Sequence, residues 1–209
     1  MAALTRAERL VVAVAAFGFF FDAYELLTLP LIVGPAFRDL LAAAPGSPTF
    51  NFWAGLIFWA PAVCGGLFGL AGGHLADRFG RRQILVWSIL VYAAASLAAA
   101  FSTSALMFLL CRCLIMVGVC VEFVAGIAWL AEMFSDPKRR EGAVGVAQAV
   151  AGFGGLAVTG LWLLIVKVAS DLPMIAGGHA EWRYLCLSGL LPAIPLIVVR
   201  PSCPNRRCG

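Results

Sequence analysis

The sequence predicts an all-α, polytopic membrane protein, and three observations carry this prediction. First, its 209 residues are 62% apolar and only 12% charged, whereas a soluble domain carries about 25% charged residues. Second, the mean hydropathy is +0.95, and a globule of this size cannot hide so much apolar surface from water. Third, the apolar residues form runs long enough to cross a bilayer. These features exclude a soluble enzyme, a disordered chain and a disulfide-stapled secreted module.

Six apolar runs approach the roughly 20 residues that a helix needs to span the hydrocarbon core. The predicted spans are residues 10–33, 52–75, 84–101, 106–134, 143–166 and 185–199. We expect residues 1–9 to form a cytoplasmic N-terminus, residues 10–199 to form the six-helix transmembrane bundle, and residues 200–209 to form an atypical cytoplasmic tail.

Each span has its own polar content. Asp22, Tyr24 and Glu25 interrupt the first span, and the third span holds no charge. The fourth contains Arg112 and Glu122. The main polar groups of the fifth are Gln148 and Thr159, and the short sixth span follows Trp182 and Tyr184, whose rings suit the headgroup level.

Lysine and arginine positions predict the orientation. With the N-terminus inside, most of the 15 cations lie in the N-terminus, in the two inner loops and in the C-terminal tail. Only Arg38, Lys167 and Arg183 lie in the outer loops, and Arg112 lies within a span. Positive residues accumulate on the cytoplasmic side. We therefore expect a multi-pass protein of the plasma or inner membrane with both termini cytoplasmic and the lipid bilayer as its solvent.

Glycines in the second span predict close helix packing. Gly65, Gly69 and Gly73 recur at every fourth residue and so share one face of a helix. Small residues let another backbone approach closely in lipid, where no hydrophobic force draws helices together.

Four ionisable residues fall inside predicted spans: Asp22, Glu25, Arg112 and Glu122. Each costs about 2.5–3.5 kcal/mol at the bilayer centre, so none is expected to face lipid as an ion. Arg112 is a suitable partner for Asp22, for Glu25 or for a substrate carboxylate. Two interpretations remain open, a buried structural ion pair and a site for substrate or protons.

The segment between the second and third spans reads GHLADRFGRR, from Gly73 to Arg82. Its two glycines bracket a tight turn in which Asp77 can accept hydrogen bonds from Arg78 or Arg81. The whole pattern resembles the loop signature of the major facilitator superfamily, and it falls between the second and third spans, where that family has it.

Two further segments strengthen the resemblance. RCLIMVGVCVE, from Arg112 to Glu122 with Gly118 inside it, resembles the fourth-helix pattern of the sugar-porter and metabolite–proton symporter branches. GFFFDAYELLTLP in the first span resembles the acidic start of these symporters. The resemblance implies half of a major facilitator fold, with six helices in two inverted three-helix repeats, and alternating-access transport of a small polar solute such as a sugar, an organic acid or phosphate, coupled to protons.

The resemblance also implies roles for individual residues. It assigns the substrate and proton cavity to Asp22, Glu25, Arg112, Glu122 and Gln148. It assigns a cytoplasmic gating latch to Gly73, Asp77, Arg78, Gly80, Arg81 and Arg82, with Glu132 and Arg140 as neighbours. We expect Gly65, Gly69 and Gly118 to pack helices.

Other functions are weighed against transport. Residues 200–209 (RPSCPNRRCG) do not resemble the family's central loop, so a truncated or frame-shifted product is one expectation. A homodimer of half-transporters that uses the glycine stripe is a second, and a non-transporting scaffold or fragment is a third. We expect no enzyme, metal, cofactor or nucleic acid, because no nucleophile–base set, metal-spaced cluster or phosphate-binding loop is present.

Overall fold

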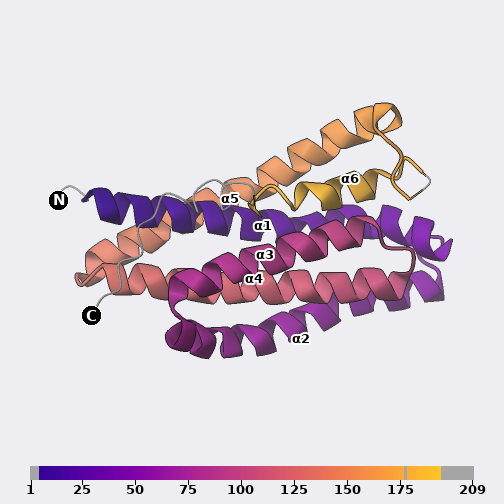
Figure 1. The fold of residues 1–209 in the computed structure, drawn as a ribbon. Coiled ribbons are helices and arrows are strands. Elements are labelled where there is room, and N and C mark those ends of the chain that lie inside the picture. Colours follow the sequence, from indigo (N-terminus) through magenta and orange to yellow (C-terminus); the bar gives the residue numbers. More distant parts are fainter. Residues whose placement is uncertain (1–4, 177, 194–209) are drawn as a thin grey trace.

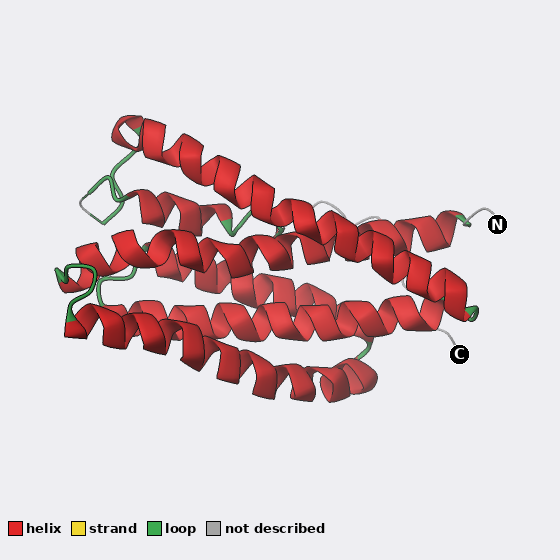
Figure 2. Ribbon diagram, turned by 180° about the vertical axis from the view of Figure 1, so that it is seen from behind, coloured by secondary structure: helices red, strands yellow, loops and turns green. Residues whose placement is uncertain are grey.

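The chain forms a bundle of long antiparallel helices in the computed structural model, which describes residues 5–176 and 178–193 (Figure 1). The helices are α1 (Arg6–Leu41), α2 (Pro48–Phe79), α3 (Arg81–Ala100), α4 (Ala105–Met133), α5 (Pro137–Val168) and α6 (Glu181–Ser188), with a 3₁₀ turn at Ala169–Asp171. Short loops join them (Figure 2), and the described residues contain one isolated β-bridge but no strand. The all-α prediction is confirmed.

Local sequence explains where the helices begin and end. Thr5 caps α1 in a reciprocal capping box with Glu8, and Ser47, Ser104 and Asp136 cap α2, α4 and α5 through their side chains. Gly80 alone separates α2 from α3, and its φ of 91° is a backbone conformation that glycine adopts without strain.

The structure describes the predicted sixth span, residues 185–199, only as far as Ala193. Helix α6 ends at Ser188 and a turn follows over residues 189–192. Pro192 lies in this turn and, lacking an N–H, cannot donate the helical hydrogen bond to the Ser188 carbonyl. Residues 194–199 and the predicted tail, 200–209, lie outside the described residues.

Within the described residues, five helices, α1 to α5, are long and apolar enough to cross a membrane. Helix α1 packs along α5, α2 packs along α4, and α3 also lies against α4. The loops fall into two groups. The start of α1, the α2–α3 connection and the α4–α5 connection lie at one end of the bundle, which we call the N-terminal end, and the other helix connections lie at the opposite end (Figure 1).

The glycine stripe of α2 faces α4. Gly65 and Gly69 lie against Met116 and Cys120, but the third member in close contact is Gly72, against Val121, rather than the predicted Gly73. Gly72 follows Gly69 by three residues. Helix positions three or four residues apart share a face, so Gly72 continues the stripe. Since α4 of the same chain covers it, the stripe is not free for the dimer contact considered from the sequence.

Candidate functional site

A layer of buried polar groups crosses the middle of the bundle. Glu25 on α1 and Arg112 on α4 are 1% and 2% exposed, and their Oε2 and Nη1 atoms are 3.6 Å apart. The second Nη of Arg112 donates to the main-chain carbonyl of Glu25 at 3.2 Å. The cation therefore pairs with Glu25, one of the partners that the sequence left open.

Helix α6 closes this ion pair from one side. Ser96 on α3 donates to the main-chain carbonyl of Cys186 at 2.8 Å and lies 3.4 Å from Oε1 of Glu25. Gly189, just after α6, has no room for a side chain, because a Cβ there would collide with that same Glu25 oxygen and with the Ser96 hydroxyl. Tyr24 and Ser188 are hydrogen-bonded through their hydroxyls, which ties α1 to the end of α6.

Asp22 and Glu122 form the other part of the layer, without a cation. Both are buried, and neither oxygen of Asp22 has a hydrogen-bond partner among the described residues. Glu122 Oε2 and the Tyr92 hydroxyl on α3 are also buried without one. Gly18 on α1 lies under Glu122, where a Cβ would come within 2.5 Å of its Oε1. Two carboxyl groups are thus held in an apolar interior, and no cation from the described part of the chain is bound to them.

The structure brings four of the five predicted cavity residues together but encloses them. Asp22, Glu25, Arg112 and Glu122 lie inside the bundle, between helices, rather than on an open wall. Gln148, on α5, is exposed.

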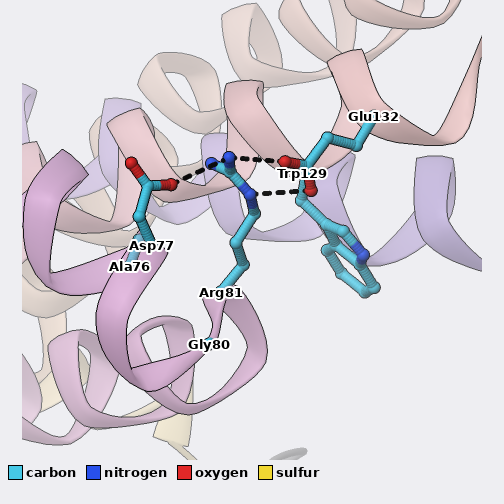
Figure 3. A pocket seen from close by; sticks show the side chains of 6 residues that line it. All are labelled: Ala76, Asp77, Gly80, Arg81, Trp129 and Glu132. Carbon is cyan, nitrogen blue, oxygen red and sulfur yellow. Dashed lines mark hydrogen bonds and ion pairs between the residues drawn. The ribbon is translucent and has the colours of Figure 1, made fainter. Parts of the chain in front are cut away.

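A second charged cluster lies at the N-terminal end. Arg81, the first residue of α3, donates from Nε and Nη2 to both carboxylate oxygens of Glu132 on α4, at 2.7 and 2.6 Å, and reaches Asp77 on α2 at 3.1 Å (Figure 3). With Trp129 these side chains line an open pocket of about 430 Å³. One guanidinium therefore joins the ends of three helices.

The other predicted latch residues lie around this cluster or outside it. Arg78 is exposed, with its guanidinium 5.7 Å from the centre of the Phe79 ring, and Arg140 is exposed. The side chain of Arg82 lies outside the described part of the chain. Gly73 lies beside Val124, and Gly118 packs its backbone against Ser88 and Tyr92 of α3.

Sequence reasoning missed two ion pairs. Arg139 on α5 pairs with Glu8 on α1 at 3.0 Å. At the opposite end, Arg183 pairs with Asp39 at 3.0 Å. Both carboxylates could have been singled out as charged residues at the ends of α1, Glu8 in its first turn and Asp39 in its last. Neither belongs to the motifs that carried the resemblance.

Comparison with known proteins gives the family. Residues 10–201 match the model of the Major Facilitator Superfamily. A curated relative from Cupriavidus pinatubonensis, described as a "Probable 4-methylmuconolactone transporter", is 32% identical over 132 residues, which cover 63% of this chain and 29% of the relative. "Inorganic phosphate transporter 1-4" of Arabidopsis thaliana is 26% identical, over 93% of this chain and 40% of its own length.

Solved structures agree on the fold. The inward-open xylose transporter XylE from E. coli superposes with a TM-score of 0.76 at 19% identity, over 94% of this chain and 48% of that one. The chain thus spans less than half the length of the relatives that it matches. A family match along almost the whole chain, and a fold that agrees with it, identify this multi-pass membrane protein as a member of the Major Facilitator Superfamily.

Proposed function

We propose that the chain forms the amino-terminal half of an alternating-access transporter that carries a small polar solute together with protons. The observation that carries the proposal is the buried layer of Asp22, Glu25, Arg112 and Glu122. Ionisable groups within a membrane domain are costly and are a mark of substrate or ion pathways. In this family the substrate is held between two six-helix halves, each made of inverted three-helix repeats.

Proton coupling is the role of the unpaired acids in this proposal. Across residues 5–176 and 178–193, no cation is bound to Asp22 or Glu122, whereas Glu25 is held by Arg112. A carboxyl group without a counter-ion in an apolar interior is stable when it carries a proton and unstable when it does not. Asp22 is the proposed proton carrier, with Glu122 and the Tyr92 hydroxyl beside it, and the Glu25–Arg112 pair is the proposed fixed charge.

The distribution of cations supports an orientation with the N-terminal end in the cytoplasm. Eight lysines and arginines belong to the loops and helix ends there, namely Arg6, Arg9, Arg78, Arg81, Arg82, Lys138, Arg139 and Arg140. Three belong to the opposite end: Arg38, Lys167 and Arg183. The positive-inside rule then puts the Arg81–Glu132 cluster on the cytoplasmic side, where we propose that it acts as the gating latch.

The relatives suggest a panel of solutes for a test. Those compared carry names of transporters for a lactone, phosphate and xylose. The test measures uptake of sugars, organic acids and phosphate by cells that express the gene, with and without an imposed pH gradient. We expect one solute class to accumulate, driven by the gradient. Asp22→Asn is expected to abolish accumulation driven by the pH gradient. Asp171→Asn, at an exposed carboxylate of the opposite end, is expected to leave that accumulation intact.

Two other outcomes have distinct signatures. Purified chain that moves solute in liposomes, and that cross-links as a pair, would indicate a homodimer of halves. No uptake of any solute, in cells or in liposomes, would contradict transport and favour a scaffold. Uptake that ignores the pH gradient in the parent protein would contradict proton coupling alone.

A further inference from the structure

The bundle carries a second charged cluster whose position mirrors that of the Arg81–Glu132 pair. Helix α1 packs on α5 and α2 packs on α4. If α1, α2 and α3 are exchanged with α4, α5 and α6, the α1–α5 contact becomes the α4–α2 contact. An inverted repeat requires this correspondence. The same exchange carries features of the N-terminal end to the opposite end.

Arg81 and Arg183 are related in this way. Arg81 opens α3 and pairs with Glu132 in the last turn of α4. Arg183 lies in the first turn of α6 and pairs with Asp39 in the last turn of α1. Each arginine thus joins the start of a repeat's third helix to the end of the other repeat's first helix.

The cluster around Arg183 is the more deeply buried of the two. Arg183 donates to the carbonyls of Ala100 and Ser102 at 3.0 Å each and to Asp39 at 3.0 Å. Its guanidinium lies 4.4 Å from the centre of the Trp182 ring, and the Trp182 indole N–H donates to the same Asp39 oxygen at 3.1 Å. Asp39 keeps 42% of its side chain exposed, so water reaches this end of the pair.

What these contacts hold in place is a short helix. Helix α6 has 8 residues, and a helix of that length is not stable by itself in water, so its position depends on packing. Beyond Arg183, the same helix covers the buried ion pair, through the Cys186 carbonyl bonded to Ser96 and through Gly189 against Glu25. Releasing the start of α6 would therefore open a path for water to Glu25.

We propose that Asp39, Trp182 and Arg183 form a latch that holds α6 as a lid over the Glu25–Arg112 pair, and that opening the latch admits water to the charge layer from the opposite end. The Arg81 cluster and this latch then control the two ends of one half. The lid adds a gate to the proposed transporter, but its test needs no solute, so failure of the lid and failure of transport are distinguishable.

Cys186 reports on the lid. It is buried on α6, one turn after Arg183, so a water-soluble maleimide reaches it when the lid opens. The test labels the purified protein in lipid nanodiscs, where both ends face water, and quantifies each cysteine by mass spectrometry of peptides. Asp39→Asn removes the charge and keeps the shape. We expect it to speed Cys186 labelling about ten-fold or more, as loss of a charge-assisted hydrogen bond implies.

Controls separate the lid from general loosening. Arg38→Gln changes an exposed neighbour of Asp39 and should leave Cys186 labelling at the parent rate. Cys120, which lies against Gly65 and Gly69 of α2 rather than under α6, should label at the same rate in all variants. Arg183→Lys keeps the charge but not the paired donors, and an intermediate rate is expected. An unchanged Cys186 rate in both Asp39→Asn and Arg183→Lys would overturn the proposal, as would equal acceleration by Arg38→Gln or at Cys120.

Discussion

Replacing Arg112 by methionine removes the cation of the buried layer and leaves Glu25 alone in the interior. The two charged atoms are 3.6 Å apart. At an effective dielectric constant of about 20, Coulomb's law gives an attraction of about 5 kcal/mol at that distance. Breaking a buried pair from one side typically costs about 3–5 kcal/mol. We therefore expect Arg112→Met to lower the free energy of unfolding by about 3–5 kcal/mol.

A double-mutant cycle tests whether this loss belongs to the pair. Reversible unfolding in mixed detergent micelles would be measured for Arg112→Met, Glu25→Gln and the double variant. The double variant leaves no charge at either position, so it should be more stable than the sum of the single losses predicts, with a coupling of about 3 kcal/mol. A coupling below about 1 kcal/mol would show that the two groups do not stabilise each other, and the assignment of Glu25 as a fixed charge would be wrong.

The remaining predictions use the same unfolding measurement. Asp22→Asn removes a charge that has no partner, so stability should hold or rise within about 1 kcal/mol; a loss as large as that of Arg112→Met would mean that Asp22 is paired after all. Gly154→Ala places a methyl group into the main chain of α1 and should cost about 1–3 kcal/mol, while Gly152→Ala, which faces open space, should cost far less; equal losses would contradict the α1–α5 packing. Glu132→Gln breaks an exposed pair with Arg81 and should cost about 1 kcal/mol or less, shrinking further at high salt; a larger, salt-independent loss would refute that description.

Much of the architecture follows from local sequence. The length and hydropathy of each run specify a helix, and the caps at Ser47, Ser104 and Asp136 mark where helices begin.

The partners of the charged residues could not be predicted in the same way. Spacing puts Asp22 and Glu25 on one helix face, but only the rotation of α4 against α1 decides that Arg112 meets Glu25. Close packing of Gly154 against α1 had a visible signal in the small residues spaced along α5. That signal did not say which neighbouring helix would come near.

Gly80 gives the bundle a mechanical property. With one residue between α2 and α3, the connection has no spare length, and the next residue is the arginine that grips the end of α4. A tilt of α2 would therefore be transmitted to α3 and would strain the Arg81–Glu132 ion pair. Lengthening the α2–α3 connection by a few flexible residues would let α2 and α3 tilt independently, and a movement of one helix would no longer be transmitted to the other.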